Sequence, residues 1–451
     1  MSEVRSSVTG ITWPGLPAPG GAALLALQFQ LEQSQWWPEP ELRAWQFRQL
    51  DVLLRHAAST VPFYAERLRG LWPSAGPAAP VSPERFAALP ILTRAEAKDA
   101  GDALRSTAVP PAHGRQHDLQ TSGSTGMPLR TAGTEVTQFF WAGLLLRDHL
   151  WHERNLQGKL AVIRSDVQLG VRDGWGPVTD DTFESGPLVT LPLHEGIDRQ
   201  LDWLVAQNPD YLLTFASNAA ALLVRAAERG IRLPRLRELR TIAESLPADL
   251  RERAQVVWGV PVVDAYSSSE LGYIALQCPR HPHYHVQAEN LLVEILDDRG
   301  QPAFPGEAGR VVATTLHNFA TPLIRYWSGD YAMAGAACPC GRGLPVLERV
   351  MGRVRNMLRL PDGTRRWPSF LSKYWAGVGP IRQVQLVQHA VDHLEVRAVI
   401  DRDFTADETA TLQAVFAKTL QFPYRIEVSR VARIERGAGN KYEEFLCLIP
   451  D

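Results

Sequence analysis

Apolar residues recur at intervals of three and four after Pro40, and this spacing predicts a helix that packs one face against the rest of the chain. Leu42, Trp45, Leu50 and Leu53 mark its apolar stripe. The preceding segment is rich in proline and glycine and holds only a short apolar run, which favours an irregular arm with at most one helix.

Short apolar runs alternate with amphipathic stretches through the middle of the chain. Runs of four to six apolar residues are typical of buried strands, and alternation with helices indicates a parallel α/β sheet. The bulky helix at 134–149 is also expected to contribute one or two side chains to an apolar pocket. The expected strands are 160–163, 188–193, 211–215, 239–243 and 260–263, and the expected helices are 134–149, 197–207 and 217–229.

The last hundred residues follow a different pattern. After Asn356, apolar alternation marks short strands around one amphipathic helix, which indicates a small α+β unit. The expected strands are 384–387, 394–400 and 424–428, and the expected helix is 406–420.

Composition narrows the function classes. A chain of 451 residues is too long for one small core and favours two or three parts. The net charge of −2 and the absence of a long basic run argue against a nucleic-acid partner. The apolar stretches 22–29 and 142–146 fall short of the roughly 18 residues that cross a bilayer, and Glu3 argues against a signal peptide. We therefore expect a cytoplasmic protein without a membrane partner.

Three of the four cysteines lie in two short knuckles, Cys-x-x-His and Cys-x-Cys. Four soft or borderline ligands fit a closed, tetrahedral and structural zinc site, whereas four cysteines are too few for a disulfide framework. Free thiols in a reducing compartment are the alternative. The predicted zinc ligands are Cys278, His281, Cys338 and Cys340, and His283 and His285 compete for the histidine position.

A hydroxyl-rich segment, Thr-Ser-Gly-Ser-Thr-Gly-Met-Pro at 121–128, predicts a loop that binds phosphate. Glycine lets the backbone approach a ligand, and hydroxyl and N–H groups can cradle an anion. It is not a Walker A motif, because no Gly-Lys-Ser/Thr follows at the required spacing. A solvated turn is the alternative. The candidate phosphate-binding residues are Thr121, Ser122, Gly123, Ser124, Thr125 and Gly126.

Two further polar motifs stand where ligands usually bind. The run 264–270 follows an expected strand, and in open α/β sheets ligands bind beyond the carboxyl ends of strands. It supplies Tyr266, Ser269 and Glu270. The run 321–330 ends in Asp330, whose two oxygens suit a pair of hydroxyl donors. A helix N-cap turn and a solvated Gly-Asp turn are the respective alternatives.

These motifs, in this order, resemble the adenylate-forming (acyl-CoA synthetase) superfamily, and in particular its phenylacetate-CoA ligase-like branch. The segments Val-Pro-Phe-Tyr at 61–64, Leu-Pro-Ile-Leu-Thr-Arg at 89–94 and Cys-Pro-Cys-Gly-Arg at 338–342 support the same branch. The resemblance implies an acetyl-CoA synthetase-like fold. It consists of a large N-terminal α/β domain with mixed sheets at 1–354, including a helical arm at 1–95, and a small mobile α+β lid domain at 355–451.

The resemblance also implies a role for each candidate residue. The loop 121–126 would hold the ATP phosphates. The ring of Tyr266 would lie against adenine, and Ser269 would meet the α-phosphate. The remaining implied roles are Mg²⁺ binding for Glu270, ribose binding for Asp330, ribose or phosphate binding for Arg353, nucleotide binding for Glu244, and a bridge from the attacking carboxylate to the α-phosphate for Lys441.

The chain departs from the family pattern in several places, including Ser267 for Gly, Ser269 for Thr and Arg355 where an acid is common. Met127 or Leu129 stands where many members carry lysine, Asn356 replaces a hinge aspartate, and Asn440 separates Gly439 from the lysine. Asparagine still tolerates the backbone angles that a hinge needs. Without the loop lysine, N–H groups, hydroxyls, a metal or another residue must meet the phosphate charge.

The implied activity is an AMP-forming acid–thiol ligase, which uses ATP and Mg²⁺ to convert an aryl or arylalkyl acid to acyl-AMP and then transfers the acyl group to CoA. The acceptor could instead be an amine or a carrier-protein thiol. The chain could also be a catalytically degenerate nucleotide-binding relative, or an interaction protein that keeps only the zinc-stapled fold. The expected partners are a small carboxylic acid, ATP, CoA or another acceptor, and a second copy in a homodimer.

Overall fold

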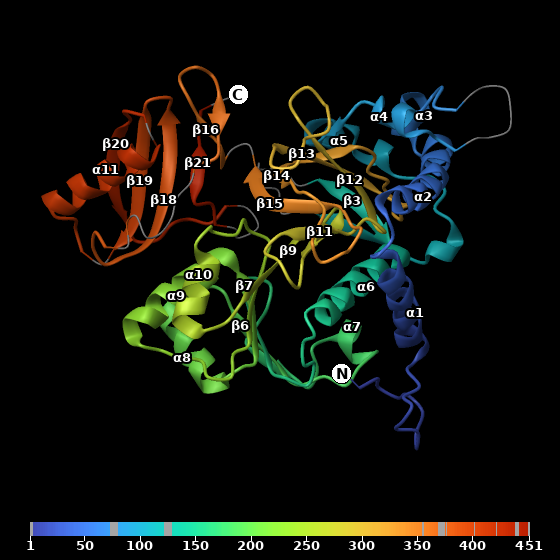
Figure 1. The fold of residues 1–451 in the computed structure, drawn as a ribbon, viewed down its shortest axis with the longest axis horizontal. Helices are drawn as coiled ribbons and strands as arrows, with labels where there is room; N and C mark the ends of the chain where they lie inside the picture. Colours follow the sequence, from blue (N-terminus) through green and yellow to red (C-terminus); the bar gives the residue numbers. More distant parts are fainter. Residues whose placement is uncertain are drawn as a thin grey trace. The chain divides into compact units, whose positions relative to one another are not determined.

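The computed structural model describes residues 3–72, 80–120, 129–353, 356–368, 375, 377–400, 402–420, 422–437 and 442–449. The chain divides into two compact units, whose elements are labelled in Figure 1. The first unit comprises Met1–Gln157, Asp173–Gly186 and Ala265–Val350, and the second comprises Gly158–Arg172, Pro187–Asp264 and Met351–Asp451.

The helices of the first unit agree with the sequence pattern. The N-terminal arm holds one helix, α1, and the expected amphipathic helix is α2. Leu42, Leu50 and Leu53 are buried as predicted, but Trp45 is 48 % exposed, and the Arg48 guanidinium lies over its ring. The helices are α1 (Pro19–Ser34), α2 (Glu39–Thr60), α3 (Pro62–Arg67), α4 (Pro83–Ala87), α5 (Arg94–Ala100), α6 (Glu135–Trp151) and α7 (Pro177–Asp180), with 3₁₀ turns η1 (Gly101–Leu104) and η2 (Pro111–His113).

The first unit is built on a mainly antiparallel sheet. Its strands follow the order β12-β13-β14-β15-β11-β10-β9, and β1 pairs in parallel with β14. Strands β2 and β3 form a separate antiparallel pair. The bounds are β1 (Leu92–Thr93), β2 (Gln116–Gln120), β3 (Arg130–Thr134), β9 (Val262–Ser268), β10 (Gly272–Gln277), β11 (Tyr284–Val286), β12 (Leu291–Leu296), β13 (Ala308–Thr315), β14 (Tyr326–Ala334) and β15 (Val346–Arg353).

The second unit contains the alternating strands and helices that the sequence predicts. Its strands run in the order β8-β7-β4-β6-β5, parallel except for β5. Leucine and alanine side chains of the helices pack with strand residues in one core. The elements are β4 (Leu160–Arg164), β5 (Gly170–Arg172), β6 (Leu188–Pro192), α8 (Ile197–Gln207), β7 (Tyr211–Phe215), α9 (Ala216–Arg229), β8 (Glu238–Ile242) and α10 (Leu250–Trp258).

The C-terminal part of the second unit forms a smaller sheet of its own, coloured orange to red in Figure 1. Its order is β20-β19-β18-β21, and α11 packs on it through Leu412 and Phe416. The elements are β16 (Leu358–Arg359), β17 (Arg365–Arg366), β18 (Ile381–Ala390), β19 (His393–Ile400), α11 (Ala406–Leu420), β20 (Arg425–Val431) and β21 (Phe445–Cys447).

The predicted fold class is confirmed: a large mixed α/β sheet is accompanied by a separate, smaller α+β part. Residues 354 and 355 lie outside the described residues, and the domain boundary placed between them stays a prediction. Among the described residues, no helix combines the length and the apolar character needed to cross a bilayer.

Candidate active site

Glu270 lies in the turn between β9 and β10. Strand β9 runs through Ser268, and β10 returns antiparallel to it from Gly272, with these two residues paired. The alternative of a helix N-cap at this motif is therefore excluded, because the next element is a strand. Gly272 has φ of +78°, a conformation that favours glycine over other residues. The sharp turn directs Glu270 into the unit, where its side chain is only 4 % exposed.

Two side chains from distant parts of the sequence hold the Glu270 carboxylate. Arg94, at the start of α5, donates from Nη1 to Oε1 at 3.3 Å, and Tyr326, at the start of β14, donates to the same oxygen at 3.4 Å. Arg94 also donates to the Tyr326 hydroxyl at 3.3 Å. Burial, and then the charge of Glu270, raise the pKa of Tyr326, so the phenol stays protonated. The buried negative charge is thus paired, as a stable buried charge requires.

Asp330, in β14, is held by two hydroxyl donors. Tyr266 of β9 donates to Oδ2 at 2.9 Å, and Ser328 donates to the same oxygen at 3.1 Å. The negative charge of Asp330 also contributes to the raised pKa of Tyr326, after burial and Glu270. Glu270 and Asp330 therefore both act on the Tyr326 phenol, and Tyr266 is bonded to Asp330.

A cavity of about 320 Å³ opens beside Glu270. Residues of β2, α6, the β9–β10 turn and the segment after β13 line it, so the β2–β3 hairpin and the Glu270 turn share one hollow. Trp141 and Tyr273 form an aromatic wall, with ring centroids 4.6 Å apart. The polar and charged residues of the β9–β10 turn that line it are Ser269 and Glu270.

The candidate phosphate loop connects the two strands of this hairpin. Gln120 at the end of β2 pairs with Arg130 at the start of β3. The loop residues themselves, Thr121, Ser122, Gly123, Ser124, Thr125 and Gly126, lie outside the described residues.

Glu244 and Arg353 belong to the second unit. The Glu244 side chain is 3 % exposed and accepts from Ser217 N at 2.8 Å, from Tyr442 N at 2.7 Å and from Arg436 Nη1 at 3.2 Å. The backbone N–H of Arg353 donates to Asn356 Oδ1 at 3.2 Å. The nucleotide roles of Glu244 and Arg353 stay predictions.

Lys441 lies outside the described residues. Its neighbour Tyr442 is described, and its backbone N–H is bonded to Glu244. The predicted role of the lysine is therefore a matter for experiment.

Sequence reasoning did not assign Arg94 and Tyr326 to the site. Both lie within motifs that were recognised, 89–94 and 321–330, so their position in those motifs was the available signal. Nothing in the sequence indicates that they meet on Glu270, because the three residues are far apart along the chain.

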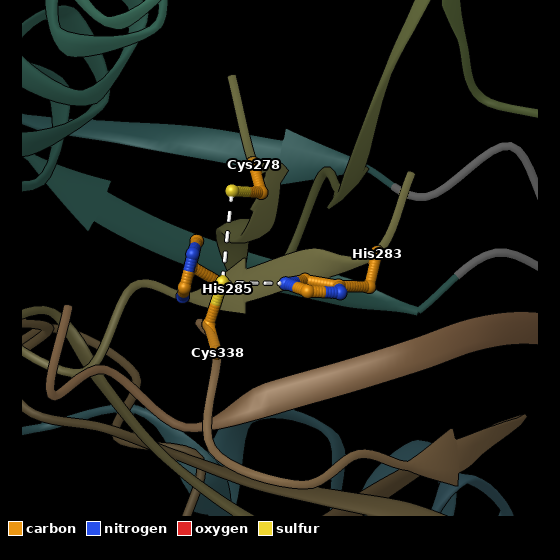
Figure 2. Close-up of side chains that lie close together, drawn as sticks. All are labelled: Cys278, His283, His285 and Cys338. Carbon is orange, nitrogen blue, oxygen red and sulfur yellow. Dashed lines mark hydrogen bonds between the residues drawn. The ribbon is translucent and has the colours of Figure 1, made fainter. Parts of the chain in front are cut away.

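A separate Cys/His cluster lies between β10–β11 and the segment that joins β14 to β15. The ligand atoms of Cys278, His283, His285 and Cys338 all lie within 4.8 Å of one another (Figure 2). The two sulfurs are 3.8 Å apart, and His283 Nε2 is 2.9 Å from the sulfur of Cys338.

This grouping differs from the predicted ligand set in two members. His281 lies outside it, with its ring stacked on His283 at 5.3 Å. Cys340 lies next to it, with its sulfur 3.5 Å from His285 Nε2. The extended backbone into β11 explains the histidines, since residues two apart on a strand face the same side. The His-x-His spacing at 283–285 was the signal for this pair.

Burial dominates the electrostatics of the cluster. It lowers the pKa of His285 to about 4, so the imidazole is neutral at pH 7 and can act as a ligand. It raises the pKa of Cys338 to about 12, so this thiol ionises at pH 7 only when a cation is close.

Comparison with known proteins gives consistent likenesses. No protein-family model matches the chain. A phenylacetate-coenzyme A ligase of Thermus thermophilus is 28 % identical over 391 residues, covering 82 % of this chain and 81 % of that protein. A 2-hydroxyisobutyryl-CoA ligase in the postadenylation state, in complex with 2-HIB-AMP, has a TM-score of 0.73 at 18 % identity, covering 92 % of this chain and 91 % of that one.

An anthranilate CoA ligase in complex with anthranoyl-AMP has a TM-score of 0.54 at 14 % identity, covering 72 % of this chain and 64 % of that one. The structural likenesses establish the fold, and the curated relative extends over most of both sequences. With the motif order already described, they confirm that the chain resembles the adenylate-forming (acyl-CoA synthetase) superfamily, and in particular its phenylacetate-CoA ligase-like branch.

Proposed function

We propose that this protein is an ATP-dependent acid–CoA ligase of the AMP-forming type. The carboxylate of a small acid attacks the α-phosphate of ATP and releases pyrophosphate, and the thiol of CoA then displaces AMP from the acyl-adenylate. The observation that carries the proposal is that Glu270 lines a cavity together with the β2–β3 hairpin, while Asp330, bonded to Tyr266, acts with Glu270 on the Tyr326 phenol. The relatives support the same reaction, because they are CoA ligases and two of them were solved with a bound acyl-AMP.

Charge placement explains how these residues would act. An attack by one anion on another is slow unless positive charge offsets the repulsion. Arg94 supplies a guanidinium beside Glu270. The Glu270 carboxylate has the oxygen chemistry that Mg²⁺ prefers and would hold the ion, which would supply positive charge to offset that of the phosphates.

Asp330 is assigned to the ribose. Tyr266 and Ser328 fix the orientation of its carboxylate, which reduces the conformational freedom lost when the ribose hydroxyls bind. In this assignment Tyr266 contributes both its ring, to the adenine side, and its hydroxyl, to Asp330.

The cavity beside Glu270 is assigned to the acid. Its volume of about 320 Å³ lies at the small end of the range for organic ligands. Trp141 and Tyr273 provide flat apolar surface, which favours an aryl or arylalkyl group. Trp141 comes from the helix that the sequence analysis expected to line a pocket.

The Cys/His cluster is proposed as a structural zinc site. With zinc–sulfur bonds of about 2.3 Å, two sulfurs of a tetrahedral site stand about 3.8 Å apart. Cys278 and Cys338 show a separation of 3.8 Å. The ion would connect the β10–β11 segment to the segment before β15. Because the chain supplies all four ligands, no coordination position would remain for a substrate.

ATP–pyrophosphate exchange against a panel of carboxylic acids tests the proposal. Acid-dependent exchange, followed by CoA-dependent release of AMP, is expected. Exchange without any effect of CoA would move the second step to an amine or a carrier-protein thiol. Folded protein that binds ATP but shows no exchange with any acid would instead be a degenerate nucleotide-binding relative. The cytoplasmic location, the homodimer and the boundary after residue 354 stay predictions.

A further inference from the structure

We propose, on the basis of the function proposed above, that the cavity beside Glu270 selects aromatic acids whose ring carries a neutral hydrogen-bonding group, such as a hydroxyl or an amine. His317 and Asn290 are the residues that recognise this group. Some polar groups of the cavity already form hydrogen bonds within the protein, whereas others have no partner there. The groups without a partner indicate what the ligand must offer.

The apolar part of the cavity is shaped for a ring. Trp141 and Tyr273 lie at an interplanar angle of 38°, and Leu271 and Leu291 are buried in the same lining. Aromatic surfaces of this kind favour a planar aromatic ligand over a flexible chain. The volume of about 320 Å³ leaves no room for a long acyl tail.

Several polar side chains of the lining already form hydrogen bonds within the protein. Thr137 donates to Thr134 O at 2.7 Å within the cap of α6. Asn318 donates to Ala132 O at 3.0 Å and accepts from Thr321 N at 3.0 Å. These groups hold the walls in place and have little hydrogen-bonding capacity left for a ligand.

Three half-buried polar side chains of the lining, His117, Asn290 and His317, have no hydrogen-bond partner among the described residues, and Asn290 and His317 are the two assigned to recognition. Within the described part of the chain, neither the amide of Asn290 nor the imidazole of His317 has a hydrogen-bond partner, and Nδ1 of His317 is fully buried. Enclosing such groups against an apolar ring would be unfavourable, whereas a ligand that bonds to them removes the penalty. The ligand that fits best therefore has a polar atom on its ring.

The surroundings of His317 indicate that the ring substituent it recognises is uncharged. Its ring stacks on Phe140 with centroids 3.8 Å apart, which fixes the plane of the imidazole. Burial, and then the neighbouring His113, lower the pKa of His317 to about 4, so it is neutral at pH 7. None of the described residues that line the cavity is lysine or arginine. A second carboxylate on the ring would therefore meet no lysine or arginine among these lining residues.

The test measures ATP–pyrophosphate exchange with matched acids on the full-length protein. The panel pairs benzoate and phenylacetate with their ring-hydroxylated and ring-aminated forms, and adds a benzene dicarboxylate and an aliphatic acid of similar volume. At least one neutral substituted acid should exceed its parent in kcat/KM by about tenfold, the effect of one well-made hydrogen bond. A parent acid, the dicarboxylate or the aliphatic acid as the best substrate would overturn the inference while leaving the ligase function intact.

A substitution at His317 tests whether this residue recognises the ring substituent. His317→Phe retains a flat ring against Phe140 but removes both nitrogens, and it should reduce the ratio of substituted to parent acid to about one. His389→Phe makes the same exchange in the C-terminal sheet and should leave the ratio unchanged. A ratio that survives His317→Phe would remove His317 from recognition. Absence of exchange with every acid would overturn the ligase function, and this inference with it.

Discussion

At the scale of single residues, the site depends on a buried charge and on the partners that hold it. The sequence predicted Glu270 and Asp330, because each stands in a short motif with a chemical reason for a carboxylate. It could not predict Arg94 or Tyr326 as partners, because they lie 176 and 56 positions from Glu270 and their meeting depends on the pairing of β1 with β14.

Removal of Arg94 should destabilise the protein and slow acid activation. Arg94→Met leaves the Glu270 carboxylate, only 4 % exposed, without its cation, and loss of one partner of a buried pair costs about 3 kcal/mol. Urea denaturation measures this free energy, and Arg94→Lys, which keeps the charge, should lose less. Equal stability of the wild type and both variants would show that the pair does not hold Glu270.

Burial of His317 should make stability depend on pH. Its pKa is about 4 in the folded protein and near its ordinary value of 6.5 in the unfolded chain. The unfolded state therefore takes up a proton first, so the contribution is complete above pH 6.5 and is lost as the pH falls towards 4. The difference in unfolding free energy between pH 7 and pH 4.5 should shrink by about 1 to 3 kcal/mol in His317→Phe. An unchanged difference would mean that the imidazole is solvated.

At the scale of elements, the period of apolar residues predicted the bounds of an element best where that element buries a single face. Helices α8 and α11 begin and end at the predicted residues, since their apolar stripes are complete. No strand was predicted between residues 264 and 351, where β10 to β15 form. The burial of β10 does not alternate, because both of its faces are covered, and its sequence therefore lacks the period of two that marks a half-buried strand.

The position of His285 in β11, within the Cys/His cluster, predicts that this histidine is a metal ligand. The protein purified without chelators should contain about one zinc per chain. His285→Ala should lose the ion and lower the melting temperature. His281→Ala is the matched control, because His281 stacks on the cluster without belonging to it, and it should retain the zinc. Zinc loss in His281→Ala alone would restore the ligand set predicted from the sequence.

Glu244 connects two segments of the second unit. Its carboxylate accepts from Arg436 and from the N–H of Tyr442, the residue that follows Lys441. Glu244→Gln keeps the shape but removes the charge that pairs with Arg436. It should slow pyrophosphate exchange about tenfold, as expected for one charge-assisted hydrogen bond, and spare thioester formation from added acyl-AMP. Equal slowing of both half-reactions would indicate a general structural role.

At the scale of the whole molecule, the order of motifs along the chain indicated a resemblance to the family before any coordinates, and the likenesses in sequence and fold confirm that resemblance. The identity of the acid could not be predicted in this way. It depends on which polar groups of the cavity remain without partners, and the sequence does not show how Thr137 or Asn318 use their hydrogen bonds.

The two half-reactions should separate at Lys441. A lysine beside the α-phosphate offsets the charge of the attacking carboxylate and has no such task in thiol transfer. Lys441→Ala should therefore abolish pyrophosphate exchange and leave the conversion of added acyl-AMP and CoA to thioester largely intact. Equal loss of both steps in a folded variant would contradict the role given to the lysine.

The most direct test of the central claim is a crystal structure of the protein with the acyl-adenylate of its best acid. We expect the ribose to bind Asp330, the phosphate to lie beside Glu270 and the β2–β3 hairpin, and the acyl ring to lie between Trp141 and Asn290. An adenylate bound elsewhere, with this cavity free of the acyl group, would contradict it.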